Sequence, residues 1–308
     1  MIRNPAGIPA TFVQTTRELH GEAGLLWLSR LPGVIIEYER RWSIHVETPV
    51  WPLSYNYVAP AVRADGTRAV LKACVPTREF YSEAAALVLY AGQGAARLLE
   101  ADLEAGVLLL ERLDPGTRLR TLPDGAEATS IAVGVMRQLW RPVPEGTALI
   151  PLSSWVGGLA RLRAMFDGGT GPFPARLVEE AEARFVDLLA SLGEPVVLHG
   201  DLHHDNILMA ERQPWLAIDP KGVAGEAEYE TAAWIQNMVP ADTPRAEARR
   251  IYERCIAQLA EELGFERQRI RDWVVAQQVL GTFWMLEGHG HGWEQGLAEA
   301  EILAAIKV

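Results

Sequence analysis

The succession of strand-like and helix-like segments predicts an α+β protein of two lobes, with a small antiparallel β lobe before a larger, mainly helical one. Extended patterns fill residues 42–73 and 106–113. Helical patterns dominate the remainder, where only residues 195–222 return to short apolar runs bounded by turn residues. We therefore expect an N-terminal lobe over residues 1–113 and a C-terminal lobe over residues 114–308.

The N-terminal lobe is predicted to start with a helix and to continue as an antiparallel sheet. Leucines at helical spacing predict a helix over residues 11–32, which should end near Pro32. The Asp65-Gly66 pair separates two extended runs and is a strong hairpin signal. The Ala- and Leu-rich segment 78–90 then predicts a second helix, which turns a carboxylate back toward the sheet.

The C-terminal lobe carries several helical patterns, at residues 125–139, 153–166, 175–192, 243–264 and 273–288. Thr243 followed by Pro244 supplies a helix start, and Gly264 supplies a helix end. His289 and His291 lie among glycines, so this stretch is predicted to be a turn. Two histidines without neighbouring carboxylates or cysteines make a poor metal site.

Composition and charge restrict the class of protein. The 308 residues are 49% apolar, which is ample for a buried core, and the net charge of −11 argues against nucleic acid or an anionic membrane as a partner. We expect no membrane span and no secretory leader. Cys74 and Cys255 are expected to be buried free thiols, which fits a cytoplasmic protein. We expect a monomer or a weak homodimer.

Polar residues follow two short apolar runs in the segment PVVLHGDLHHDNILMAERQPWLAIDPKG. Asp201 comes soon after the run at 196–198, and Asp219 comes directly after the run at 215–218. A hairpin in this segment should bring Asp201, Asn206 and Asp219 to one edge. Two carboxylates and an amide oxygen at one edge are suited to a divalent cation or a proton.

Two other interpretations of this segment remain open. His199, His203 and His204, together with Asp201, could form the zinc site of a hydrolase. The carboxylates could also simply cap turns. The order Asp-x-x-x-x-Asn with a further Asp thirteen residues later favours phosphoryl transfer, because it matches the catalytic loop and metal-binding Asp of kinases.

The runs HGDLHHDN and AIDPKG resemble the aminoglycoside phosphotransferase and related kinase-like families. DPKG is most similar to the streptomycin 6-phosphotransferase and hydroxyurea phosphotransferase branch. The resemblance implies a protein-kinase-like fold and a phosphotransferase that depends on ATP and Mg²⁺. It implies that Asp201 accepts or orients the acceptor hydroxyl, that Asn206 and Asp219 bind Mg²⁺, and that His199 braces the loop. A nucleotide-binding module without catalysis is the remaining alternative.

The strand that ends in Ala-Val-Leu-Lys resembles the kinase strand whose lysine contacts ATP phosphates. The resemblance therefore gives Lys72 this role. Glu83 is expected to pair with Lys72, because it shares a helix face with Leu87 and Tyr90. Glu79 remains an alternative partner. Lys221 is expected to offset charge on the transferred group.

The resemblance also places the nucleotide's other contacts. Glu111 and Leu113 follow the last strand of the N-terminal lobe and are expected to contact adenine through their backbone. The phosphate-covering turn falls at LSYNYV, which has no glycine, whereas protein kinases use a glycine-rich loop. Phosphate contacts would therefore come from residues such as Ser54.

The acceptor is expected to be a small cationic molecule, because acidic and aromatic residues follow the metal-binding Asp. The candidates for acceptor binding are Glu226, Glu228, Glu230, Trp284 and Glu287. A streptomycin-like aminoglycoside is the preferred acceptor, which would give antibiotic resistance. An amino sugar, a choline-like amine and hydroxyurea are the alternatives.

Overall fold

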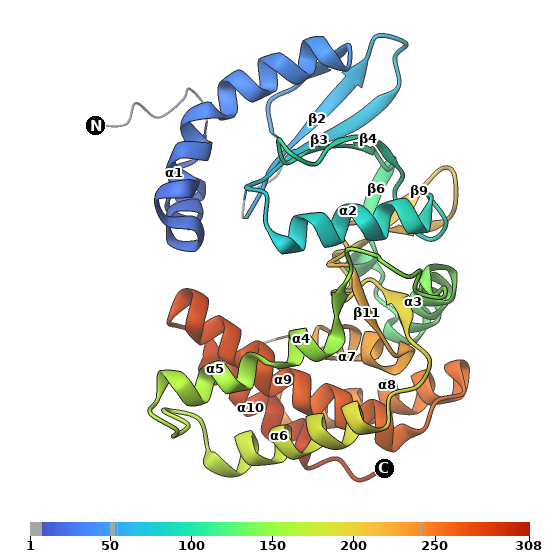
Figure 1. The fold of residues 1–308 in the computed structure, drawn as a ribbon. Coiled ribbons are helices and arrows are strands. Elements are labelled where there is room, and N and C mark those ends of the chain that lie inside the picture. The colour runs from blue at the N-terminus through green and yellow to red at the C-terminus, as the bar shows by residue number, and fades with distance from the viewer. Residues whose placement is uncertain (1–7, 50–52, 54, 241) are drawn as a thin grey trace.

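The smaller of two lobes contains a five-stranded antiparallel sheet together with two helices, and helices form most of the larger lobe (Figure 1). The computed structural model describes residues 8–49, 53, 55–240 and 242–308. After a first long helix at residues 10–41, the strands of this sheet follow along the chain, and the helices of the larger lobe come later. The predicted two-lobed α+β fold is therefore confirmed.

The sheet has the strand order β1-β2-β3-β5-β4, and every neighbouring pair is antiparallel. At the predicted hairpin between β2 and β3, the backbone N–H of Thr67 donates to Asp65 Oδ1. Lys72 pairs with Val58 on one side and with Leu108 on the other, so its backbone is fixed in the middle of the sheet. The strands are β1 (Ile44–Val46), β2 (Tyr57–Arg63), β3 (Arg68–Ala73), β4 (Leu98–Asp102) and β5 (Val107–Glu111).

The first helix, α1 (Ala10–Arg41), continues past the predicted end near Pro32, so that prediction is wrong. The helix bends instead at Gly21, whose φ of 56° and ψ of −133° are not helical. Leu31 and Tyr38 lie on either side of Pro32 and are buried in the core of the lobe. This burial offsets the one hydrogen bond that a proline cannot donate within a helix.

The helix α2 (Arg78–Tyr90) lies between the sheet and the helical lobe (Figure 1). Thr77 caps its start by accepting a hydrogen bond from the Phe80 N–H at 3.4 Å. Phe80 and Leu87 are buried in a cluster with Leu108 of β5. The apolar face of α2 thereby fixes the orientation of the polar residues on its other positions.

The C-terminal lobe is built around α9 (Arg267–His289), which contacts α5, α6, α7, α8 and α10. The predicted helix 125–139 is confirmed, and the one at 243–264 ends as expected at Gly264, which has a φ of 77°. The segment 153–166 is divided into two helices at Gly157. The other helices are α3 (Gly125–Leu139), α4 (Leu152–Val156), α5 (Gly158–Met165), α6 (Ala175–Ala190), α7 (Glu230–Gln236), α8 (Arg245–Leu263) and α10 (Trp293–Ala304).

Two small sheets lie between the five-stranded sheet and the long helices of the C-terminal lobe, and they flank the loop after β8. One sheet has the order β10-β9-β6, and the other has the order β7-β11-β8. The predicted hairpin is therefore formed by β9 and β10, whereas β8 pairs with β11 of the other sheet. The strands are β6 (Pro115–Arg118), β7 (Ile150–Pro151), β8 (Val196–Leu198), β9 (Ile207–Ala210), β10 (Trp215–Ala217) and β11 (Val223–Gly225).

Cys74 and Cys255 are buried free thiols, as expected, and burial raises the pKa of each to about 12. Among the helices in the described part of the chain, none is long and apolar enough to cross a membrane.

Candidate active site

The loop from β8 to β9 carries Asp201 and Asn206. Gly200 turns the chain just before Asp201 with a φ of 80°, a left-handed conformation that favours glycine. Asn206 Nδ2 donates to the carbonyl oxygen of Asp201 at 3.0 Å, which directs the amide oxygen of Asn206 away from that carbonyl. The Asp201 side chain is 38% exposed. The loop therefore presents an accessible carboxylate next to an amide oxygen.

His199 braces this loop from the interior. Its Nδ1 accepts a hydrogen bond from the Asp201 N–H, so its Nε2 carries the proton and donates to the Ile218 carbonyl oxygen at 2.8 Å. Burial lowers the pKa of His199 to about 4, so the imidazole is neutral at physiological pH. The expected bracing role fits this geometry.

The histidines do not form a zinc site, so that alternative is wrong. Both ring nitrogens of His199 are engaged by the backbone. The His204 ring is stacked on Trp234 with ring centroids 3.8 Å apart. Within the described ranges, no group of three or more His, Cys, Asp and Glu side chains could hold a metal ion. The segment is therefore unsuited to zinc hydrolysis.

Lys72 connects the two lobes through two carboxylates. Its Nζ lies 2.6 Å from Glu83 Oε1 on α2, and it also contacts Asp219 Oδ1 just after β10. Lys72 thus pairs with Glu83, as the helical spacing predicts, and not with Glu79. The Lys72 side chain is 5% exposed and that of Asp219 is 51% exposed. Asp219 can therefore meet a ligand while Lys72 holds its other side.

Electrostatics distinguish the two aspartates. The Lys72 ammonium holds the pKa of Asp219 well below its usual range. Burial raises the pKa of Asp201, although the charges of His203 and Lys221 oppose this rise. Asp201 is therefore the more basic carboxylate and the better proton acceptor, whereas Asp219 stays ionised and suits a cation.

Ser82 fastens α2 to the C-terminal lobe. Its hydroxyl donates to the Gly222 carbonyl oxygen and accepts from the Ile150 N–H at 3.0 Å. A Cβ added to Gly222 would lie 2.3 Å from the Ser82 carbonyl oxygen, so only glycine fits this contact. Because Ser82 precedes Glu83, this contact fixes the carboxylate that holds Lys72.

Glu111 is the last residue of β5, and its carboxylate is hydrogen-bonded to another side chain of the protein. It accepts two hydrogen bonds from the Arg212 guanidinium, at 2.8 and 2.9 Å. The Glu111 N–H donates to the Arg97 carbonyl oxygen at 2.8 Å. An adenine contact from Glu111 would therefore use its carbonyl oxygen. Leu113 is buried just beyond it. Ser54, the expected phosphate contact, lies outside the described residues.

Glu226 was expected to bind the acceptor, and the structure corrects this. Its side chain is 2% exposed. It accepts hydrogen bonds from the Arg269 guanidinium at 2.5 and 2.8 Å and from the Trp273 indole N–H. These partners lie on α9, so Glu226 connects α9 to the segment after β11. A carboxylate that is enclosed and paired in this way has no surface for a small-molecule cation.

Glu230 is also wrongly predicted as an acceptor contact. It is fully buried and accepts hydrogen bonds from the backbone N–H groups of His199 at 2.6 Å and Gly200 at 2.9 Å. Burial raises the pKa of Glu230 to about 7. Glu230 therefore holds the turn that precedes Asp201, and acts on the site through the backbone.

The other three acceptor candidates lie elsewhere in the helical lobe. Glu228 is half-buried, and burial raises its pKa. Glu287 accepts two hydrogen bonds of 3.0 Å from Arg161 of α5. Trp284 lies next to Gly158, where an added Cβ would be 3.0 Å from its Nε1. Trp284 and Glu287 thus connect α9 to α5.

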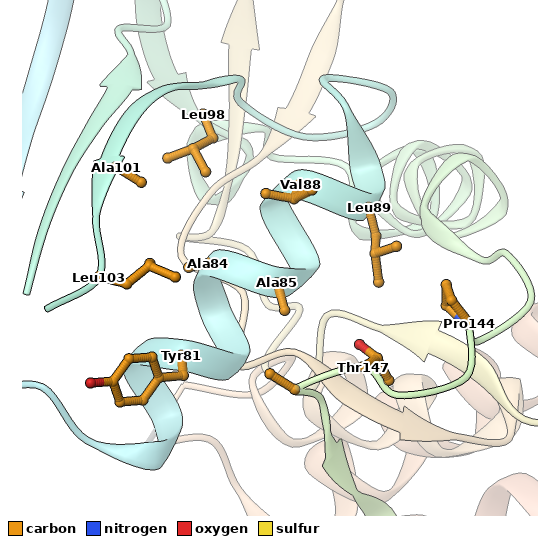
Figure 2. A pocket seen from close by; sticks show the side chains of 11 residues that line it. Tyr81, Ala84, Ala85, Val88, Leu89, Leu98, Ala101, Leu103, Pro144 and Thr147 are labelled. Carbon is orange, nitrogen blue, oxygen red and sulfur yellow. The ribbon is translucent and has the colours of Figure 1, made fainter.

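An apolar pocket of about 350 Å³ lies along one side of α2 (Figure 2). Tyr81, Ala85 and Val88 line it from α2, and residues of β4 and the segment before β7 complete it. None of the candidate site residues contributes to this pocket. The pocket is therefore separate from the candidate site residues.

Comparison with known proteins assigns the chain to a family. Residues 41–288 match the family described as Aminoglycoside/hydroxyurea antibiotic resistance kinase. The chain belongs to this family. It is 35% identical to a hydroxyurea phosphotransferase from Kitasatospora aureofaciens, over 97% of this chain and 84% of that protein. It is 30% identical to a streptomycin 6-kinase from Streptomyces griseus, over 91% of each chain. The resemblance expected from HGDLHHDN and DPKG is confirmed, and the kinase is a small-molecule phosphotransferase.

Solved structures share the fold of this kinase. A choline/ethanolamine kinase family protein from Mesorhizobium loti superposes with a TM-score of 0.64 at 13% identity, over 90% of this chain and 95% of that chain. A mutant of aminoglycoside phosphotransferase APH(4)-Ia, in a ternary complex with ADP and hygromycin B, gives a TM-score of 0.59 at 12% identity, over 90% of this chain and 100% of that chain. At these identities the likeness establishes the kinase-like fold.

The residues of this kinase fit a nucleotide and a magnesium ion. Asp219 and Asn206 supply a carboxylate and an amide oxygen, and oxygen ligands of this kind suit Mg²⁺. The residue before Asp219 is bound to Asn206, because the Ile218 N–H donates to the Asn206 carbonyl oxygen at 2.9 Å, so the two segments lie side by side. Lys72 adds a buried cation beside them. The donor set therefore matches a metal-bound polyphosphate.

Sequence reasoning missed the residues that hold the site in place. Ser82, Arg212 and Arg269 each carry a contact between segments that are distant in the sequence. The one available signal was a serine next to Glu83 in a helix that is rich in alanine and leucine. The two arginines gave no signal, because the kinase uses arginine for nearly all of its cations.

Proposed function

We propose that this kinase uses ATP and Mg²⁺ to phosphorylate a hydroxyl of a small cationic molecule, with a streptomycin-like aminoglycoside as the preferred acceptor. The observation that carries this proposal is the position of Lys72 between Glu83 and Asp219, with Asp201 and Asn206 on the adjacent loop. This arrangement supplies a phosphate-binding cation, metal ligands and a proton acceptor.

In this proposal each residue has a separate task. Lys72 contacts phosphate oxygens, and Glu83 holds its ammonium in place. Asn206 and Asp219 would hold Mg²⁺, which neutralises phosphate charge when bound. Asp201 orients the acceptor hydroxyl and takes its proton, as its raised pKa favours. Most of the rate gain is expected from positioning and charge neutralisation.

The backbone of Glu111 and Leu113 is proposed to contact the adenine ring. Both residues lie where β5 leaves the sheet, between the two lobes. The carbonyl oxygen of Glu111 can accept a hydrogen bond, while its N–H is used by Arg97. The N-terminal lobe up to this point is proposed to be the nucleotide-binding unit, with residues 114–308 carrying the acceptor site.

A cationic acceptor is supported by the accessible carboxylates near the proposed site. Asp201 and Glu79 have side chains that are 38% and 59% exposed. Glu228 and Glu287 remain proposed acceptor contacts on the helical lobe. Added salt is expected to raise the KM of a cationic acceptor, because it screens these charges. A KM that is independent of salt would favour a neutral acceptor.

Hydroxyurea is the second candidate acceptor. It is supported by the relative from Kitasatospora aureofaciens, which is 35% identical over 97% of this chain and is a hydroxyurea phosphotransferase. Hydroxyurea is neutral, so its KM should not respond to salt. The salt dependence therefore distinguishes the two candidates.

The experiment is a coupled assay of ADP formation against streptomycin, other aminoglycosides, amino sugars, choline-like amines and hydroxyurea. Mass spectrometry should show one added phosphate on the acceptor that is turned over. Asp219→Ala should abolish transfer and weaken nucleotide binding in the presence of Mg²⁺. Asp187→Ala, at an exposed position of α6, is the matched control. Full activity of Asp219→Ala, or activity of the wild type in EDTA, would contradict the proposal.

A further inference from the structure

Lys221 and Glu79 form an ion pair between the lobes, next to the proposed transfer site. Lys221 follows Asp219 by two residues, and Glu79 lies in the first turn of α2. Lys221 Nζ is 3.8 Å from Glu79 Oε2, which is longer than a hydrogen bond. The two side chains are 34% and 59% exposed. An exposed pair of this length contributes little to stability, so its separation costs little.

The other lysine of the site is held much more firmly. Lys72 lies 2.6 Å from Glu83, also contacts Asp219, and has only 5% of its side chain exposed. Its ammonium is therefore surrounded by carboxylates that fix its place. Lys221 is the cation of this site that can move to a new partner.

The backbone keeps Lys221 beside the loop that carries Asp201. The N–H groups of Lys221 and Gly222 donate to the carbonyl oxygen of His199, at 2.7 and 3.2 Å. The charge of Lys221 interacts with Asp219 and Asp201 as well as with Glu79. A phosphoryl group that passes from a nucleotide held at Asp219 to a hydroxyl held at Asp201 therefore comes within reach of the Lys221 ammonium.

We propose that Lys221 leaves Glu79 when the nucleotide binds, and donates hydrogen bonds to the phosphoryl oxygens during transfer. Glu79 is the partner that holds Lys221 while nucleotide is absent. This inference rests on the phosphotransfer proposed above. It assigns a second cation to the transfer step, in addition to Lys72, and it gives the first turn of α2 a part in positioning it.

Lys221 forms and breaks no covalent bond in the proposed transfer step. The acceptor hydroxyl proton moves to the Asp201 carboxylate, and the acceptor oxygen forms a bond to the γ-phosphorus. The bond from that phosphorus to the bridging oxygen breaks, and its electron pair remains on the β-phosphate of ADP. Lys221 supplies positive charge to the oxygens of the group in transit, which is the usual way in which such transfers are stabilised.

Binding of a transition-state mimic tests this role without knowledge of the acceptor. Affinity for ADP with Mg²⁺ is measured by calorimetry, with and without aluminium fluoride, in the wild type and in Lys221→Met, Lys221→Gln and Glu79→Gln. Aluminium fluoride should tighten binding in the wild type. In Lys221→Met and Lys221→Gln, the increase in ADP affinity caused by aluminium fluoride should be smaller by ~10²-fold. The affinity for ADP alone should change by less than about threefold. Glu79→Gln should keep the gain.

Turnover gives a second measurement with an acceptor that the wild type phosphorylates. Lys221→Met should lower kcat by ~10²-fold with little change in the KM for ATP, and Lys221→Arg should restore part of the loss. Unfolding temperatures measured without nucleotide should stay close to that of the wild type, because the Lys221–Glu79 pair is exposed.

Three results would overturn the role of Lys221. The first is an equal loss, in Glu79→Gln and Lys221→Met, of the affinity gained from aluminium fluoride. The second is an unchanged gain in the Lys221 variants, and the third is no gain from aluminium fluoride in the wild type. Equal losses would show that the ion pair acts only by holding α2. A wild type that binds no ADP with Mg²⁺ would instead contradict the proposed phosphotransfer itself, so the two failures are distinguishable.

Discussion

The buried carboxylate of Glu230 should make stability depend on pH in a way that one substitution can isolate. Its carboxylate is fully buried and accepts hydrogen bonds from the backbone N–H groups of His199 and Gly200. Burial nevertheless raises the pKa of Glu230 from 4.5 to about 7. The folded protein therefore binds a proton between these pH values that the unfolded chain has largely released.

The sign follows from this difference in bound protons. Where the folded state binds more protons than the unfolded state, the free energy of unfolding falls as pH rises. The contribution of Glu230 is therefore largest at the acidic end and is lost as pH rises through about 7. Between pH 5 and pH 8 the loss amounts to roughly 2 to 3 kcal/mol.

Glu230→Gln removes the titration and nearly keeps the shape. The difference in unfolding temperature, wild type minus Glu230→Gln, should fall by roughly 4 °C between pH 5 and pH 8. Differential scanning calorimetry across this range measures it, because all groups common to the two proteins cancel in the difference. Glu104→Gln, at an exposed position after β4, is the control and should show no such trend. A difference between wild type and Glu230→Gln that is constant with pH would refute the reasoning.

Three further predictions concern the proposed catalytic arrangement. Asp201→Asn should lower kcat by ~10²-fold or more while ATP binding stays nearly intact, and unchanged turnover would remove Asp201 from the mechanism. Lys72→Met should raise the KM for ATP and lower kcat, because it leaves Glu83 and Asp219 without their shared cation, and steady-state kinetics measure both. Gly222→Ala places a Cβ 2.3 Å from the Ser82 carbonyl oxygen and should lower kcat by ~10-fold. This loss of kcat should exceed the loss that a strained backbone conformation causes by itself. Gly264→Ala is its control, since Gly264 has a φ of 77° with nothing within 4 Å, and equal kcat losses in the two variants would contradict the packing argument.

Local spacing allowed much of the arrangement to be predicted. Glu83 shares a helix face with Leu87 and Tyr90, and burial of that face directs Glu83 toward Lys72. Asp201 and Asn206 lie five residues apart in one loop, so their proximity follows from the short chain between them. The signals for the hairpin turn at Gly66 and for the helix end at Gly264 were also local. In each case the signal and the structure that it specifies lie within a few residues.

Other features depended on partners that arrive from distant parts of the chain. Glu226 and Glu230 look like exposed acids, because charge runs are usually solvated. Arg269 reaches Glu226 from 43 residues away, and the backbone of His199 reaches Glu230 from 31 residues away. A buried carboxylate needs such partners, and their arrival is a property of the packed fold.

The sequence by itself determined the family and the two-lobed fold, and it was enough to propose Asp201, Asn206, Asp219 and Lys72 as the candidate site residues, because motif spacing and periodicity are local properties of the chain. Tertiary structure alone decided that α1 continues through Pro32, and that β8 pairs with β11 instead of joining the β9–β10 hairpin. Both outcomes depend on burial and pairing with elements that are remote in the sequence. Their free energy arises only when the core is assembled, so no local pattern encodes it.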